Sequence, residues 1–149
     1  MHANDQLTIR LHRHLLLDSG LTATDYKILA GLSEHPAGRM PAQELCSLLQ
    51  WEKSRLSHQA RRMEEQGLIV REPNPADARS VMVCLLPAGR RAIKDAAPQH
   101  VRNVRRHFTD LFTPAELDTF AALNERILHH LAEESFPGEP APDEPALPY

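Results

Sequence analysis

Apolar residues recur at helical spacing near both ends of the chain. Leu7, Leu11 and Leu15 form an i, i+4, i+8 row that predicts a first helix over residues 5–18. Thr22 and Asp25 occupy the positions of a capping box and predict the start of a second helix, which the run Pro36-Ala37-Gly38 ends. The apolar face of this second helix consists of Ile28, Leu29 and Leu32.

The middle of the chain combines a short helix with a longer amphipathic one. Pro41 at a first turn predicts a short helix over residues 41–49. A longer helix is predicted over residues 51–66, with Gly67 as its stop. The inward stripe of this longer helix consists of Leu56, Ala60 and Met63. The opposite face carries Ser54, Arg55, His58, Arg61 and Arg62. Two such helices joined by a tight connection predict a helix-turn-helix whose basic face fits a DNA major groove; a solvated helix face is the alternative.

Two β-type runs follow the basic helix. Residues 68–72 and 80–86 are separated by turn formers at 73–79, which predicts a hairpin with Pro73 and Pro75 in its tip. The tip carries Arg79 beside Asp77. An arginine there is suited to a DNA minor groove, and a surface arginine paired with Asp77 is the alternative. The hairpin makes the helix-turn-helix a winged one.

The remaining chain predicts two further helices and a tail. Pro87 begins a long helix that extends to about residue 111, with either a kink or a break at Pro98. Thr113, Pro114 and Glu116 predict the start of a last helix. Its apolar stripe consists of Leu117, Phe120, Leu123, Ile127, Leu128 and Leu131. Residues 135–149 are rich in proline and acidic side chains, so we expect a tail that is disordered or an extended strap. This tail either solubilises the protein or competes with DNA for the basic face.

The wing carries the most specific sequence motif of the chain. This motif is Asp77-Ala78-Arg79, leading through Val81, Val83 and Leu85 to Gly89. Together with Leu21-Thr22 and the run from Arg62 to Ile69, it resembles the MarR family of bacterial transcriptional regulators over roughly residues 5–134. The chain departs from the family at Leu86, where a threonine commonly caps the next helix. The resemblance implies a homodimer whose terminal helices form the interface and whose two winged modules read a palindrome.

The expected fold is mostly α with a small β-hairpin wing (α+β), in a single domain over residues 1–149. The winged helix-turn-helix occupies residues 22–87, and residues 5–20 and 88–134 form the helical dimerisation part. The apolar stripes of these terminal helices would be buried by a second copy of the chain, since two-fold dimers are the commonest oligomers.

Composition and charge limit the environments and partners that are expected for this chain. The 149 residues suit one domain, and contents of 42% hydrophobic and 25% charged residues are ordinary. No apolar run reaches the roughly 20 residues of a membrane span, and the first residues do not resemble a signal peptide. We therefore expect a cytoplasmic protein that associates with the nucleoid through DNA. The net charge of −3 hides an uneven distribution, because residues 51–91 hold eight cations and five anions, which gives +3 there and −6 elsewhere.

The basic helix and the wing suggest individual roles. Direct base reading is assigned to Ser54, Arg55, Ser57 and His58. Arg61 is assigned to a phosphate contact, and Arg79 to the minor groove. Arg62 either contacts phosphate or pairs with Asp77 to fix the wing, and the resemblance favours the pairing. Trp51 is expected in the core or at a hinge rather than stacked on bases.

A small-molecule effector is implied by the resemblance, because members of this family often bind phenolic or anionic ligands between the dimer helices and the winged module. A pocket for a small aromatic or anionic effector is predicted to be lined by His12, Leu16, Trp51 and His107. Cys46 and Cys84 have no metal or redox spacing and are expected to be buried, inert thiols. The nine histidines include no tight i, i+4 pair, so neither a metal nor another cofactor is expected.

The function predicted from the sequence is that of a sequence-specific DNA-binding transcriptional regulator. We expect a repressor that binds a palindromic operator as a homodimer and is released by a small-molecule effector. The alternative is a winged-helix protein–protein interaction module without specific DNA binding. An enzyme is not expected, because the sequence has no glycine-rich phosphate loop, paired-carboxylate motif or nucleophile elbow.

Overall fold

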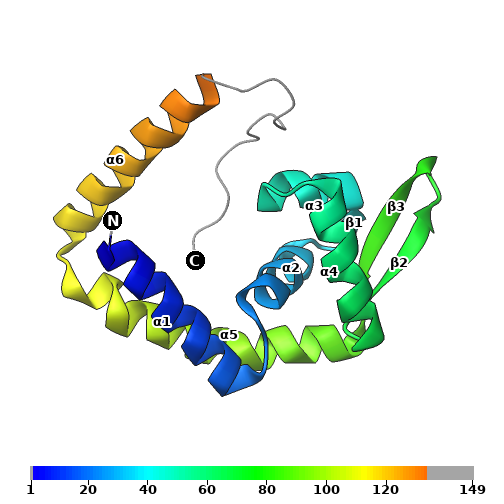
Figure 1. Ribbon diagram of the computed structural model, residues 1–149, viewed down its shortest axis with the longest axis horizontal. Coiled ribbons are helices and arrows are strands. Elements are labelled where there is room, and N and C mark those ends of the chain that lie inside the picture. The colour runs from blue at the N-terminus through cyan, green and yellow to red at the C-terminus, as the bar shows by residue number, and fades with distance from the viewer. Residues whose placement is uncertain (1, 134–149) are drawn as a thin grey trace.

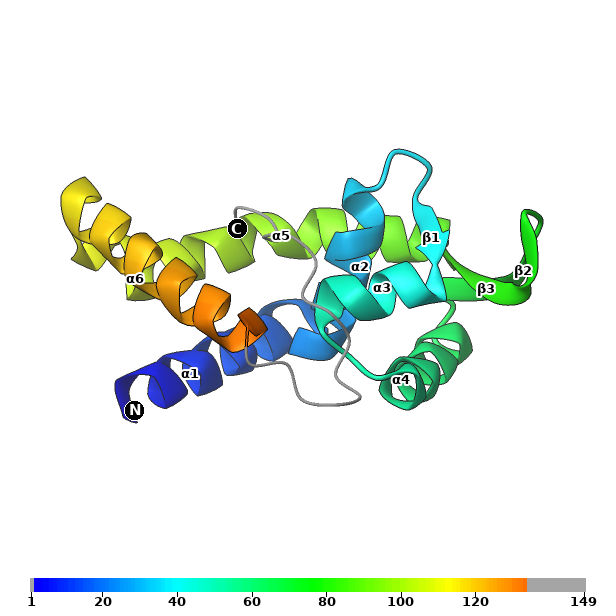
Figure 2. The same ribbon diagram turned by 90° about the horizontal axis from the view of Figure 1, so that it is seen from above.

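The protein is described by a computed structural model that covers residues 2–133. Its elements in chain order are α1 (His2–Ser19), α2 (Ala23–Glu34), β1 (Arg39–Pro41), α3 (Ala42–Leu49), α4 (Lys53–Glu65), β2 (Ile69–Asn74), β3 (Asp77–Leu85), α5 (Pro87–His107), the 3₁₀ helix η1 (Thr109–Leu111) and α6 (Pro114–Glu133). In Figures 1 and 2, α1 lies beside α5, and the β2–β3 hairpin and α6 occupy opposite ends of the molecule. The expected fold, mostly α with a small antiparallel sheet, is confirmed.

The sheet contains a strand that the sequence did not reveal. The strand order is β1-β3-β2, and β1 pairs antiparallel with β3 from Arg39↔Cys84 to Pro41↔Met82. A strand of three residues is too short to show alternation. The placement of Pro73 in the hairpin tip was wrong, because Pro73 pairs with Val81 inside β2. Proline is tolerated there because β2 is an edge strand that need not donate on its outer side.

The predicted start of α2 is confirmed in atomic detail. The Thr22 hydroxyl accepts a hydrogen bond from the Asp25 backbone N–H at 3.1 Å, and the Asp25 carboxylate accepts one from the Thr22 backbone N–H at 2.9 Å. These two bonds satisfy backbone donors that a helix start leaves free. Asp25 is thereby held at a fixed place behind the helix-turn-helix.

The long helix α5 begins at Pro87 as predicted but ends earlier than expected. It ends at His107 rather than near residue 111, and it continues through Pro98, so the alternative of a break there is wrong. Its N-cap residue, Leu86, makes no side-chain capping bond, as the missing threonine suggested. Gly89 explains the close packing here, because a Cβ at this position would collide with the carbonyl oxygen of Leu68.

One apolar core holds the winged module together. The residues buried in it include Ile28, Leu29 and Leu32 of α2, Leu45 of α3, Leu56, Ala60 and Met63 of α4, Ile69 and Val83 of the sheet, and Ile93 of α5. The predicted inward stripes of α2 and α4 are therefore confirmed. Burial of these side chains orients α4, so its opposite face necessarily points to solvent.

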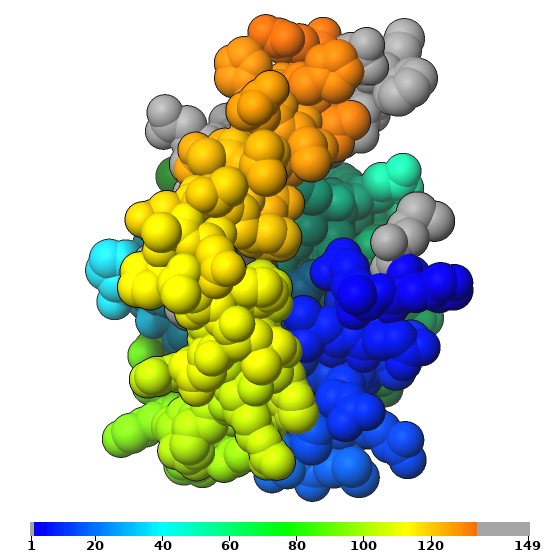
Figure 3. Space-filling model, turned by 90° about the vertical axis from the view of Figure 1, so that its left-hand side faces the viewer, coloured from blue at the N-terminus to red at the C-terminus, as the bar shows by residue number. Residues whose placement is uncertain are grey.

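The terminal helices carry apolar side chains that this chain leaves uncovered. No residue of α6 is buried, and five of its large hydrophobic residues are at least half exposed: Phe120, Leu123, Ile127, Leu128 and Leu131. On α1, Ile9, Leu16 and Leu17 are similarly exposed. Figure 3 shows α6, the end of α5 and α1 on one face of the molecule. Across residues 2–133, no helix is long and apolar enough to cross a membrane. The predicted tail at 135–149 lies outside the described residues.

Candidate nucleic-acid interface

The connection between α3 and α4 makes a tight turn. Gln50 has a left-handed backbone with φ of 54°, and the Trp51 backbone N–H donates to the Cys46 carbonyl at 2.9 Å. Trp51 then enters the core with 5% of its surface exposed, so its predicted packing role is confirmed. The turn places the first residues of α4 at the outer edge of the module.

The outward face of α4 contains the residues assigned to base and phosphate contacts. Ser54, Arg55, Ser57, His58, Arg61 and Arg62 are all exposed on this helix. The Arg55 guanidinium lies over the Trp51 ring at 4.2 Å from its centroid. A cation stacked on an aromatic face has fewer side-chain conformations to lose on binding. Arg55 is therefore partly ordered where α4 begins.

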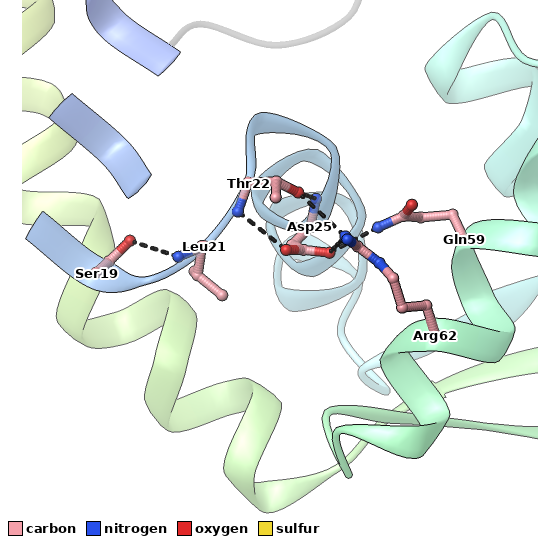
Figure 4. A network of polar contacts seen from close by, with 6 residues as sticks. All are labelled: Ser19, Leu21, Thr22, Asp25, Gln59 and Arg62. Carbon is pink, nitrogen blue, oxygen red and sulfur yellow. Dashed lines mark hydrogen bonds and ion pairs between the residues drawn. The ribbon is translucent and has the colours of Figure 1, made fainter. Parts of the chain in front are cut away.

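Asp25 is the centre of a polar network behind α4 (Figure 4). Its Oδ1 accepts hydrogen bonds from Gln59 Nε2 at 2.6 Å and from Arg62 Nη2 at 2.8 Å. The expected pairing of Arg62 with Asp77 is wrong, because Arg62 faces α2 and the Asp77 carboxylate is occupied at the wing tip. Arg62 keeps 43% of its side chain exposed, so a phosphate contact remains within its reach.

The wing tip is fixed by its own side chains. Asn74 Nδ2 donates to Ser80 Oγ at 2.7 Å, and Asn74 Oδ1 accepts from the Ala76 backbone at 3.0 Å. Asp77 Oδ1 accepts from the backbone N–H of Arg79 at 2.9 Å, not from its guanidinium. Within the described part of the chain, the Arg79 guanidinium has no hydrogen-bond or ion-pair partner. The tip therefore presents an unneutralised cation.

Arg71 is a site residue that the sequence reading missed. Its Nη2 lies 2.8 Å from Glu64 Oε2, and its Nη1 donates to Ser57 Oγ at 3.2 Å. Ser57 is thus already bonded to the wing, which changes its expected role as a base reader. Arg71 and Glu64 lie on either side of Gly67 in the sequence. Their spacing alone does not indicate that the chain reverses there and brings the two side chains together.

The four residues assigned to an effector pocket lie in different surroundings. His12 and Leu16 are exposed on α1, Trp51 is buried under Arg55, and His107 stacks on His14 with ring centroids 5.3 Å apart. An open groove of about 420 Å³ lies instead against α1. It is lined by Gln6, Ile9, Arg10, Arg13, His14 and Leu17. The two arginines give this groove a cationic lining.

The thiols and the histidines show no metal-binding arrangement. In the described range, no group of three or more histidine, cysteine, aspartate or glutamate side chains is placed to hold a metal ion. Cys46 and Cys84 are free and half-buried. Burial raises the pKa of both thiols, and Glu72 raises the pKa of Cys84 further. Both cysteines therefore have little thiolate at neutral pH.

Known proteins share both sequence motifs and this architecture with the chain. A model described as "MarR family" matches residues 19–80. The crystal structure of AbsC, a MarR family transcriptional regulator from Streptomyces coelicolor, is similar with 39% identity and a TM-score of 0.84, covering 87% of each chain.

Two further relatives extend the likeness. Sco3205 from Streptomyces coelicolor, a MarR family transcriptional regulator solved in complex with DNA, has 30% identity and a TM-score of 0.85 over 95% of this chain and 89% of its own. The multiple antibiotic resistance protein MarR of Salmonella typhimurium is 29% identical over 119 residues, which are 80% of this chain and 81% of that protein.

Proposed function

Because the chain belongs to the MarR family of transcriptional regulators, we propose that it binds a specific double-stranded DNA sequence as a homodimer. The observation that carries this proposal is the pairing of two cationic surfaces on one rigid module. These surfaces are the outward face of α4, with Arg55 and Arg61, and the wing tip, with the unpaired Arg79. The relative Sco3205 was solved in complex with DNA, which supports the same partner here.

In this proposal α4 is the recognition helix and enters the major groove. Ser54, Arg55 and His58 face base edges, and Arg55 has the fork of donors that reads guanine. Arg61 and the exposed part of Arg62 contact phosphate, while Arg79 inserts into the adjacent minor groove. Asp77 has an indirect role, because its carboxylate holds the backbone from which Arg79 projects.

The homodimer is supported by the uncovered apolar residues of α1 and α6. So many exposed large apolar side chains are unusual on a monomer, and a symmetric partner buries such residues in two-fold dimers. Two recognition helices related by a two-fold axis would read a palindromic operator, with half-sites about 34 Å apart along the DNA.

Regulation by a small molecule is the final part of the proposal. The chain acts as a repressor, and a small aromatic or anionic effector releases it from DNA. The cationic groove on α1, with Arg10, Arg13 and His14, supports an anionic effector. The assignment of His12, Leu16, Trp51 and His107 to the effector pocket stays a prediction, which their replacement in an effector titration would test.

The test is fluorescence anisotropy of the purified chain with DNA from upstream of its own gene, across a salt series and with random DNA as the control. Tight binding of the upstream DNA that weakens steeply with salt and with Arg79→Ala is expected. Lys94→Ala is the matched control, because Lys94 is an exposed cation on α5 outside the winged module. Equal and weak binding of both DNAs by the native chain would favour a winged helix that serves a protein partner.

A further inference from the structure

Arg71 connects the wing to the recognition helix through one carboxylate. Its Nε and Nη2 donate to Glu64 Oε2 at 3.1 and 2.8 Å, and its backbone N–H donates to Glu64 Oε1 at 2.7 Å. One residue of β2 therefore uses both oxygens of a glutamate on the last turns of α4. The two side chains are only 30% and 26% exposed, so solvent screens this pair less than a fully exposed one. The hydrogen bond from the Arg71 side chain also holds the pKa of Glu64 below its usual value.

A third contact extends this connection along the helix. Arg71 Nη1 donates to Ser57 Oγ at 3.2 Å, and Ser57 lies seven residues before Glu64, about two helical turns away. The planar guanidinium thus bonds α4 at two separate places. Two anchor points fix both the distance and the tilt of β2 relative to α4, whereas one point would leave a hinge.

The hydrogen bonds of the wing tip transmit this placement to Arg79. Asn74 and Ser80 join β2 to β3 across the turn, and Asp77 fixes the backbone of Arg79. The wing is therefore braced at its base by Arg71 and at its tip by these side chains. The position of Arg79 relative to Arg55 on α4 depends on both sets of bonds.

We propose that Arg71, held by Glu64 and Ser57, is a positioning residue that sets the wing so that Arg79 and Arg55 engage one DNA site together. This inference rests on the proposed function. Its physical basis is preorganisation, since a wing that is already placed loses less conformational freedom when both grooves are occupied. The competing role for Arg71 is a direct phosphate contact.

Glu64→Gln distinguishes the two roles by the sign of its effect. If Arg71 positions the wing, loss of the carboxylate loosens the brace, and affinity for the upstream DNA falls by about tenfold. If Arg71 binds phosphate, the same change frees its charge, and affinity is unchanged or rises. Glu65→Gln is the matched control, because Glu65 is the exposed neighbour of Glu64 and this variant also removes one carboxylate from the end of α4. Affinity that is equal to or above that of the control would overturn the positioning role.

A double-mutant cycle measures the coupling between Glu64 and Arg79 in DNA affinity, which general destabilisation of the fold would not change. In the Glu64→Gln background the wing is no longer held in the groove, so Arg79→Ala should cost several-fold less affinity than in the native background. Arg55→Ala should cost about the same in both backgrounds, because α4 itself is oriented by its buried stripe. Fully additive effects of Glu64→Gln and Arg79→Ala would overturn the proposal.

Amide hydrogen exchange of the DNA-free protein tests the brace separately. Glu64→Gln should speed exchange over residues 72–82 while leaving α2 and α5 unchanged, and unchanged exchange in the wing would overturn the proposal. If the native chain binds no specific DNA, the proposed function fails and the positioning role fails with it. Specific binding together with additive mutational effects removes only the positioning role.

Discussion

Arg62 on α4 donates a hydrogen bond to the buried carboxylate of Asp25 on α2, with 2.8 Å between Nη2 and Oδ1. The same carboxylate caps α2 and accepts from Gln59, and Asp25 itself is only 2% exposed. A single acidic residue therefore joins the start of α2 to the inward side of α4. This contact adds to the buried apolar stripe of α4 in holding the helix against α2.

Replacement of Asp25 should be costly for stability. Asp25→Ala removes the cap and leaves Gln59 and Arg62 without their acceptor, which should lower the free energy of unfolding by about 2–4 kcal/mol. Urea unfolding measures this change. Asp77→Ala is the comparison, and a double-mutant cycle should show coupling of Arg62 with Asp25 but none with Asp77. Coupling with Asp77 instead would contradict the observed pairing.

Replacement of Arg55 should reduce sequence discrimination. Arg55→Ala should weaken binding to the specific DNA by about 1–3 kcal/mol and relax the preference at one base pair of each half-site. Arg55→Lys retains the charge but loses the paired donors. Compared with Arg55→Ala, it should therefore keep more of the overall DNA affinity but little of the discrimination between bases. Competition binding against a library of single-base variants measures both quantities. A uniform loss over all variants would reassign Arg55 to a phosphate contact.

Interruption of the apolar face of α6 should separate the dimer. Leu123 and Ile127 are 50% and 57% exposed in the single chain, and Leu123→Glu or Ile127→Glu would place a charge in the proposed interface. Sedimentation velocity should show a dimer for the native chain and a monomer for each variant. Val81→Glu is the matched control, because Val81 is an exposed apolar residue on the wing and its variant should stay dimeric. A dimer in all three variants would place the interface elsewhere.

Stability should fall in mild acid because of two histidines between α1 and α5. Burial lowers the pKa of His100, and nearby His12 lowers it further; the His100 ring also packs against Tyr26. Burial also lowers the pKa of His107, as do three cationic neighbours: His14, Arg106 and Arg10. Below about pH 6.5 the unfolded chain takes up protons that the folded chain resists, so the free energy of unfolding rises with pH through that range.

The pH prediction is checked by urea midpoints at about pH 7.5 and 5.5. The urea midpoint should fall less between the higher and the lower pH in the His100→Gln/His107→Gln variant, because this variant lacks the two groups whose pKa is lowered. His58→Gln, at an exposed position of α4, should decline as the native chain does. Equal slopes for the native chain and the double variant would show that other groups govern the acid sensitivity.

Local patterns in the sequence were sufficient for the long helices and the hairpin of the fold. The stripe Leu56, Ala60 and Met63 identified the inner face of α4, and Thr22 with Asp25 identified the start of α2. Gly67 follows the end of α4 with φ of 71°, as expected for a left-handed cap. Each of these signals lies within about two helical turns of sequence, so the residue types alone carry it.

Contacts between distant segments had no such signal. The resemblance favoured Asp77 as the partner of Arg62, yet Arg62 pairs with Asp25, 37 residues earlier in the chain. Arg71 went unassigned because its partners, Glu64 and Ser57, become neighbours only when the chain reverses at Gly67. Likewise, β1 is recognised only by its pairing with β3, and Pro73 fits a strand only because β2 is at the edge.

The sequence by itself determined which side chains of α4 face outward, because helical periodicity separates the buried face of the helix from its cationic face. Only the tertiary structure decided how those side chains are held. The angle of the wing depends on Arg71 bonding to α4, and Arg62 of α4 is held by Asp25, which another helix supplies. Pairings of this kind are set by the packing of the whole module, since each requires two elements to be placed before either side chain has a partner.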